Sequence, residues 1–238
     1  MGKNSISRRE LFRVGGLSVL AAAISPAVSR SDAWAAIKCN PGAPTDAAGA
    51  LSALVEGNAR WAAEDQEHPG EGTARRTCLA TNPQTPFASI LSCSDSRNPP
   101  ELIFDQGLGD IFVARVAGNT ASGRLIDSLL YGTKVLETPL LFVLGHSVCG
   151  AITTAVASFP NPHGLPFVNL LFPAVKKARK IVKQNGGDPN DPAQVIPVAT
   201  DQNVLITVEE LRRHFRLGSG RVAGGVYDLA TQLVTILT

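Results

Sequence analysis

The fold of this chain is decided by two short apolar runs, Phe87-Ala-Ser-Ile-Leu-Ser92 and Leu140-Leu-Phe-Val-Leu-Gly145. Each run has the length of a strand and contains no charged residue, with Ser89 and Ser92 as the only polar side chains in the first run, which is typical of a strand buried on both faces. A third run, 111–116, lies between them and is followed by a helical pattern over about 122–137. Short strands that alternate with helices predict an α/β domain with a mostly parallel central sheet flanked by helices.

Outward from these strands, the helical spacing of apolar residues predicts the remaining elements. Toward the N-terminus we expect a helical arm over about 47–64 and a shorter helix over about 74–80. Toward the C-terminus, helices are expected from Cys149 to about 158, over 168–184 and over 201–215. The runs 222–229 and 233–237 are predicted strands, the second at a sheet edge. The sequence has no internal repeat, so we interpret it as a single domain.

The composition is that of an ordinary globular protein with one substantial core. The chain has 238 residues, of which 44% are hydrophobic and 18% charged, a balance that excludes disordered and collagen-like classes. Aromatic residues make up only 5%, which argues against a stacking platform for single-stranded nucleic acid. Four cysteines are too few for a disulfide scaffold in a chain of this length.

The first 35 residues are predicted to be a cleavable export signal. Arg8 and Arg9 precede a short, mildly apolar stretch, and Ala33-Trp34-Ala35 fits an A-x-A cleavage site. The arginine pair resembles a twin-arginine signal, and the alternative is an ordinary secretory signal with a chance arginine pair. The apolar stretch is too short for a stable membrane anchor. The expected destination is the periplasm, or the thylakoid lumen if the source has one.

Removal of this signal changes the charge balance of the chain. The net charge of +2 falls to −1, because 17 basic and 18 acidic residues follow residue 35. The composition therefore gives no support for a surface that binds nucleic acid or another polyanion. We expect a linker over 36–46 and then a domain over 47–238, which carries the candidate site.

Three candidate metal ligands lie at the ends of two predicted strands. Cys93 ends the first run, His146 follows the last one, and Cys149 comes three residues later. Ligands of an open parallel sheet collect beyond the carboxyl ends of its strands. A helix that begins near Cys149 would turn both later donors toward one point and lower the pKa of a thiol. Two sulfurs and one imidazole suit Zn²⁺ and leave its fourth position open for chemistry.

Other interpretations of these residues stay open on spacing alone. Cys93 and Cys149 could be small buried hydrophobic residues, with His146 a hydrogen-bonded core histidine. They could form a structural zinc site, although such sites usually have four protein ligands. A Cys93–Cys149 disulfide would also be permitted in an oxidising compartment.

An aspartate and an arginine close to the first cysteine favour a catalytic site. In Cys93-Ser-Asp-Ser-Arg97, an extended backbone would point alternate residues the same way and place Asp95 beside both the metal and Arg97. Such an ion pair could orient a metal-bound water or compete with it. An exposed pair without this role would contribute almost nothing to stability.

Three blocks of this sequence resemble the signature of the β-class carbonic anhydrases: Cys93-Ser-Asp-Ser-Arg97, Arg115-Val-Ala-Gly-Asn119 and His146-Ser-Val-Cys149-Gly150. The likeness runs from about residue 54 to at least residue 152 and weakly reappears over 224–229. It implies one Zn²⁺ per subunit, bound by Cys93, His146 and Cys149, with Asp95 and Arg97 as a catalytic dyad. It also implies reversible hydration of CO2 to bicarbonate and a proton by a zinc-bound hydroxide.

The resemblance to the plant-type branch of that family extends to the substrate pocket. It implies that Gln84, Phe112, Tyr131 and Gly150 line the pocket, with Gln84 hydrogen-bonded to a product oxygen. In those relatives the first three come from the neighbouring subunit, so a homodimer or higher homo-oligomer completes each site. The alternatives are a loop amide for Gln84, a strand core residue for Phe112 and a helix-packing residue for Tyr131.

Some positions bear on how closely this chain follows the family. Ile90 stands where members with a closed, bicarbonate-regulated site commonly carry tryptophan, so we expect an open site with Asp95 paired to Arg97. The segment 217–221 is short, Gln232 stands where relatives often have glycine, and Leu130 where many carry glutamate. These departures bear on the C-terminal packing and the subunit arrangement.

Two rival functions remain from the sequence. The same zinc centre could hydrolyse carbon disulfide or carbonyl sulfide, because these are also small linear electrophiles. The protein could instead be a zinc-binding or thiol-redox module without turnover. The second rival has no need of the Asp95–Arg97 pair, which argues against it.

Overall fold

The structure, a computed structural model, describes residues 38–162 and 164–238. The predicted export signal falls outside the described residues and stays a prediction. Among the described residues, no helix is both long and apolar enough to cross a membrane.

A five-stranded sheet forms the centre of the described domain, as the apolar runs predict. Its strand order is β2-β1-β3-β4-β5, and all neighbouring strands are parallel except the antiparallel pair β4 and β5. Both β2 and β5 are edge strands. The strands are β1 (Ala88–Ser92), β2 (Ile111–Arg115), β3 (Leu140–His146), β4 (Val222–Tyr227) and β5 (Val234–Ile236).

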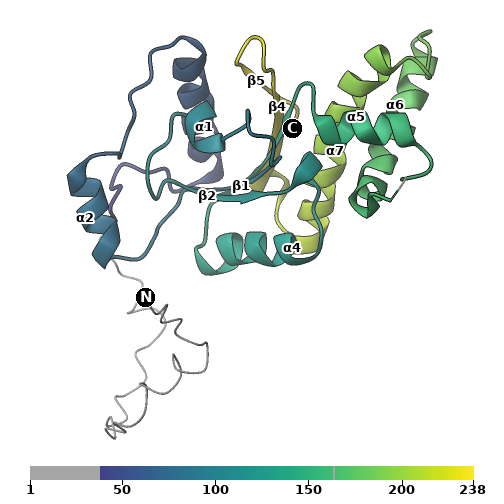
Figure 1. Cartoon of the computed structure of the whole chain (residues 1–238). Helices are drawn as coiled ribbons and strands as arrows, with labels where there is room; N and C mark the ends of the chain where they lie inside the picture. The colour runs from purple at the N-terminus through teal and green to yellow at the C-terminus, as the bar shows by residue number, and fades with distance from the viewer. Residues whose placement is uncertain (1–37, 163) are drawn as a thin grey trace, which may run out of the picture. The chain divides into compact units, whose positions relative to one another are not determined.

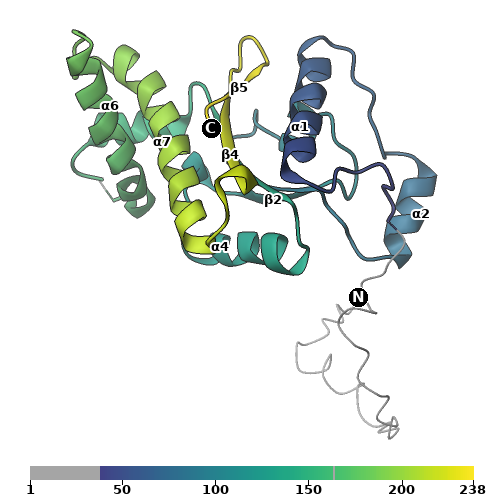
Figure 2. The ribbon, with the colours of Figure 1, turned by 180° about the vertical axis from the view of Figure 1, so that it is seen from behind.

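Helices cover both faces of this sheet (Figure 1). The arm helix α1 and the short α3 pack on one face, while α4 and α7 pack on the other; Figure 2 shows α4 and α7 from behind. Beyond the sheet, α5 and α6 pack against the first half of α7. The helices are α1 (Ala47–Ala62), α2 (Thr73–Thr81), α3 (Pro100–Ile103), α4 (Gly123–Leu130), α5 (Gly150–Ser158), α6 (Phe172–Gln184) and α7 (Pro192–Phe215).

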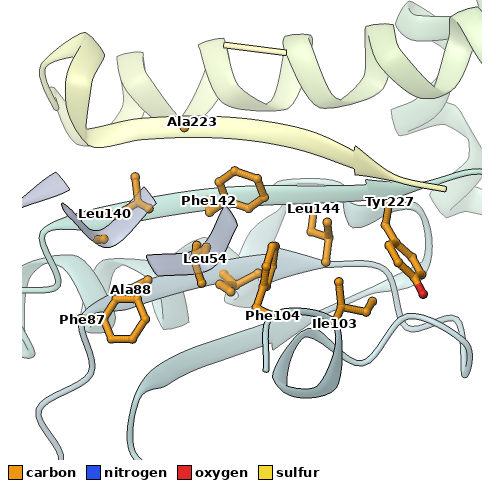
Figure 3. Close-up of a cluster of buried hydrophobic side chains, with 12 residues drawn as sticks. Leu54, Phe87, Ala88, Ile103, Phe104, Leu140, Phe142, Leu144, Ala223 and Tyr227 are labelled. Atoms are coloured by element: carbon orange, nitrogen blue, oxygen red, sulfur yellow. The ribbon is translucent and has the colours of Figure 1, made fainter. Parts of the chain in front are cut away.

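The core follows from the alternation of side chains along β3. Phe142 and Leu144 point toward α1 and α3 (Figure 3), whereas Leu141 and Val143 point toward α4 and α7. All of these side chains are buried, which explains why β3 shows no polar alternation in the sequence. On the α1 face, the rings of Phe104 and Phe142 meet edge to face with their centroids 5.6 Å apart.

The structure differs from the sequence expectations at three helices. The helix expected over 168–184 is a 3-10 segment, Pro166–Leu171, followed by α6. α7 begins at Pro192, nine residues before the expected start, because Asp191 caps its N-terminus by accepting from the Ala193 amide and Pro197 is tolerated inside the helix. The pattern over 122–137 forms α4 and then a π-helical turn, Tyr131–Val135.

The four cysteines divide into one disulfide and two free thiols. Cys39 and Cys78 form a disulfide that closes 39 residues of sequence, whereas Cys93 and Cys149 are free and buried. The alternative of a Cys93–Cys149 disulfide is therefore not adopted. The segment expected to be a plain linker is tied to the domain through Cys39.

A buried carboxylate fixes the end of α1 and gives the first prediction. Asp105 accepts from the Arg60 side chain at 2.6 Å and from the amides of Glu67 and His68. Burial alone would raise the pKa of Asp105, but these hydrogen bonds lower it overall.

Replacing Asp105 with asparagine should lower the free energy of unfolding by about 2–3 kcal/mol at pH 7, because it leaves the Arg60 charge unpaired. A carboxyl with a lowered pKa stabilises the fold above its unfolded pKa of about 4 and loses that contribution at lower pH. In urea titrations, the difference between wild type and variant should therefore shrink from pH 7 to pH 3. A difference that stayed constant with pH would contradict this assignment.

Candidate metal centre

Three donor atoms meet at the carboxyl end of the sheet. Cys93 follows β1, His146 ends β3, and Cys149 is the N-cap of α5. Because β1 and β3 are parallel neighbours, their ends lie at the same edge of the sheet. The ligand atoms of the three residues all lie within 4.8 Å of one another, and each residue is at most 4% exposed.

The chemistry of these donors fits a zinc ion. His146 Nδ1 lies 2.9 Å from the Ser147 carbonyl oxygen, to which a protonated Nδ1 donates, so that Nε2 is left as the metal-binding atom. The buried Nε2 has no hydrogen-bond partner in the described part of the chain. The two sulfurs lie 3.9 Å apart, too far for a disulfide. Three such donors are the number that catalytic zinc sites use.

The two thiols influence each other's pKa in opposite directions. The hydrogen bond from the Cys149 thiol lowers the pKa of Cys93, and contacts with His146 and the Gly118 amide lower it further. The nearby Cys93 sulfur and burial raise the pKa of Cys149, although the amides that begin α5 act the other way. The expected lowering by a helix start is thus outweighed at Cys149. Metal coordination requires both sulfurs as thiolates.

Asp95 and Arg97 form a two-pronged ion pair beside these donors. Arg97 Nε and Nη2 donate to the two carboxylate oxygens at 2.9 and 2.8 Å. Asp95 Oδ2 lies 3.8 Å from His146 Nε2. The hydrogen bonds from Arg97 hold the pKa of Asp95 well below its usual range, so the carboxylate is ionised at neutral pH. The predicted position of Asp95, beside both the donors and Arg97, is confirmed. The backbone over 93–97 does not continue as an extended strand, however, because it turns after Asp95.

The loop between the second and third donors supports the position of Arg97. Val148 has φ of 54°, a left-handed conformation that a β-branched residue rarely adopts. In this conformation its carbonyl oxygen accepts from Arg97 Nη2 at 3.3 Å. Unfavourable backbone geometry of this kind is often found at functional sites.

Arg115 and Gly118 belong to one of the family blocks, but the sequence alone predicts no role for them. Arg115 donates to the carbonyl oxygens of Cys93 and Asp95 at 3.0 and 2.7 Å, which fixes the backbone between them. The Gly118 amide donates to the Cys93 sulfur at 3.3 Å. Gly118 has φ of 73°, and a Cβ there would crowd Leu171 and Ala151. The sequence feature that could identify Arg115 is its place at the end of the predicted strand 111–116. In the structure it pairs with Ser92, the residue before the first zinc ligand.

The structure does not bring all predicted site residues together in one chain. Gly150 adjoins the metal donors at the start of α5. Phe112 instead pairs with Ser89, four residues before Cys93, which is about 13 Å along a strand. The Tyr131 ring packs against Phe112 at a tilt of 46°, with the ring centroids 6.0 Å apart. Gln84 is exposed and lies just before β1.

Comparisons with known proteins agree with this site. The sequence profile of the carbonic anhydrase family matches residues 88–234. Carbonic anhydrase 2 of Mycobacterium tuberculosis is 36% identical over 186 residues, covering 76% of this chain and 84% of that protein. A carbonic anhydrase of Mycolicibacterium smegmatis is 40% identical over 136 residues, covering 55% of this chain and 66% of that protein.

Solved structures show the same fold. The β-carbonic anhydrase CcaA superposes with a TM-score of 0.59 at 26% identity, covering 79% of this chain and 95% of that one. The Coccomyxa β-carbonic anhydrase gives a TM-score of 0.55 at 27% identity, covering 79% and 86%. The fold and the site thus define an α/β protein with a Cys/His/Cys metal-binding site at the carboxyl edge of its sheet. The chain belongs to the β-carbonic anhydrase family.

Proposed function

We propose that this chain is a zinc-dependent carbonic anhydrase that converts CO2 and water reversibly to bicarbonate and a proton. The observation that carries the proposal is the buried Cys93, His146 and Cys149 donor set, with an ionised Asp95 held beside it by Arg97. A zinc ion bound there would act as a Lewis acid that ionises water near neutral pH.

The residues around the proposed zinc site would each have a separate role in the reaction. With zinc bound, the Asp95 carboxylate would accept a hydrogen bond from the attacking water and orient it toward CO2. Arg97 keeps that carboxylate charged and oriented, because it binds both carboxylate oxygens. Arg115 and the Val148 carbonyl hold this pair in place. The Gln84 amide of a neighbouring subunit would donate to a product oxygen.

Stopped-flow measurements with three substrates test this proposal. Zinc-analysed protein should accelerate CO2 hydration strongly over buffer, and it should hydrolyse carbon disulfide and carbonyl sulfide far more slowly. Preference for a sulfur substrate would favour the rival hydrolase function. Full zinc without turnover on any of the three would favour a non-catalytic zinc module.

The zinc site is expected to be open, with Asp95 bound to Arg97 and not to the metal. The Asp95 carboxylate would have to leave a two-pronged, charge-assisted pair to reach the metal. X-ray absorption at the zinc edge near pH 7 should therefore show two sulfur, one nitrogen and one solvent ligand. An Asp95 oxygen within ~2.2 Å of zinc in a crystal structure at that pH would contradict the open site.

A homodimer or larger homo-oligomer is proposed to complete each site. Phe112, Tyr131 and Gln84 lie too far from the zinc donors of their own chain to contact a substrate there. Phe112 belongs to the open edge strand β2, Tyr131 packs against Phe112, and Gln84 precedes the neighbouring strand β1. Apolar side chains beside this edge are between 39% and 48% exposed, which suits burial against a second copy; they are Leu108, Leu130, Tyr131 and Val135. A Sordaria macrospora relative of the same fold is tetrameric.

Export through the twin-arginine route to the periplasm, or to a thylakoid lumen, is also proposed. The Cys39–Cys78 disulfide supports an oxidising destination. Replacing Arg8 and Arg9 with lysine should leave the precursor in the cytoplasm, because the arginine pair is the feature read by that export system. Cell fractionation and immunoblotting measure this outcome. Normal export of the double variant would contradict the twin-arginine assignment.

A further inference from the structure

A group of residues at the amino end of the sheet lies outside the metal centre and has no role assigned above. The Cys39–Cys78 disulfide joins the segment before α1 to α2. Beside it, the Asp110 carboxylate accepts from Asn40 Nδ2 at 2.7 Å and from Arg75 Nη1 at 2.9 Å. Asp110 is only 2% exposed. We call these five residues the clasp.

The clasp provides most of the attachment of α2 to the domain. None of the nine residues of α2 is fully buried. The half-buried ones are Arg75, Cys78 and Leu79, and the first two belong to the clasp. Leu79 packs closely over Gly109. A helix with so little buried apolar surface gains little stability from packing, so the clasp determines where it lies.

The position of α2 determines where the segment that carries Gln84 begins. Asn82 ends the helix, and both its backbone and side-chain nitrogens donate to the Cys78 carbonyl oxygen, at 3.1 and 2.9 Å. At the other end of the segment, the Phe87 amide donates to the Asp110 carbonyl oxygen at 2.8 Å. The exposed Gln84 therefore lies on a short segment, 83–86, that clasp residues fix at both ends.

We infer that the Cys39–Cys78 disulfide and Asn82 are positioning elements that set the Gln84 amide for the active site of a neighbouring subunit. This inference rests on the proposed function, since it assigns the disulfide a part in that reaction. A short and fixed segment can hold an amide within a fraction of an ångström of its working position, and catalytic rates are sensitive to displacements of that size.

A double-mutant cycle tests the inference. Gln84→Ala is made in the wild type and in a Cys39→Ser/Cys78→Ser background, and CO2 hydration is measured per bound zinc at 25 °C. Gln84→Ala should lower kcat/KM about tenfold in the wild type but less than about twofold without the disulfide, because Gln84 is then already misplaced. The disulfide-free protein should retain its zinc.

A second cycle uses Asn82→Ala, which leaves the disulfide and the fold intact. In this background too, Gln84→Ala should lower kcat/KM by a smaller factor than it does in the wild type. Asp46→Ala serves as the matched control, because it removes the N-cap of α1 without altering a clasp residue. In this background, Gln84→Ala should lower kcat/KM by the same factor as in the wild type. The inference would be overturned if Gln84→Ala lowered kcat/KM by the same factor in the wild type and in both altered backgrounds. Full activity of the disulfide-free protein would overturn it as well. An inactive wild type would instead overturn the proposed function.

Discussion

Replacing Cys149 with serine should remove most of the bound zinc and nearly all CO2 hydration activity. A serine hydroxyl is a poor zinc ligand compared with a thiolate, and only Cys93 and His146 would remain as donors. Purified wild type should contain about one zinc per chain and the variant roughly a tenth of that after dialysis against a weak chelator. Elemental analysis measures both.

The matched control for this prediction is Ser94→Ala. Ser94 adjoins the first zinc ligand but its side chain is exposed, so the variant should keep its zinc and its activity. Circular dichroism of the Cys149→Ser protein should show that the fold persists, since the donors lie at an edge of a well-packed sheet. Full zinc in Cys149→Ser would show that the ligand assignment is wrong.

Replacing Asp95 with asparagine should separate catalysis from metal binding. The variant should keep about one zinc per chain, while kcat falls by roughly 10²-fold or more, because the amide cannot accept and orient as the ionised carboxylate does. The low pKa of Asp95, caused by the Arg97 hydrogen bonds, keeps the wild-type carboxylate ionised from pH 6 to pH 9. The loss should therefore be similar across that range.

Asp127→Asn on the exposed surface of α4 is the control for the same charge change, and it should have wild-type kcat. Loss of zinc from Asp95→Asn would instead identify Asp95 as a metal ligand. Unchanged kcat with full zinc would remove Asp95 from the reaction.

The sequence predicts the sheet and its zinc donors well for a physical reason. Fully apolar runs such as β3 have few alternatives to a buried strand, and parallel strands bring their carboxyl ends to one edge. The sequence therefore predicts that Cys93 and His146 lie close together at that edge. The turn at Asp95 was not expected, because it depends on the hydrogen bond from the Arg97 amide to the Asp95 side chain.

Contacts between residues distant in sequence were harder to predict. The Cys39–Cys78 disulfide joins cysteines that are 39 positions apart, and no local pattern encodes which cysteines pair. The sequence pattern does not predict the early start of α7, because Pro197 is an unfavourable residue inside a helix. Tertiary packing and the Asp191 cap stabilise the helix there. The left-handed Val148 also has no sequence signal, since its conformation results from the positions of Arg97 and the two flanking zinc ligands.

Oxygen-isotope exchange is the most direct test of the central claim that the Cys93, His146 and Cys149 centre hydrates CO2. Mass spectrometry follows the loss of ¹⁸O from labelled CO2 at chemical equilibrium, which requires repeated hydration and dehydration. Zinc-loaded wild type should deplete the label far faster than buffer. The Asp95→Asn protein should deplete it roughly 10²-fold more slowly than the wild type, and the Cys149→Ser protein should deplete it little faster than buffer. Depletion by the zinc-loaded wild type at the rate of buffer alone would contradict the account.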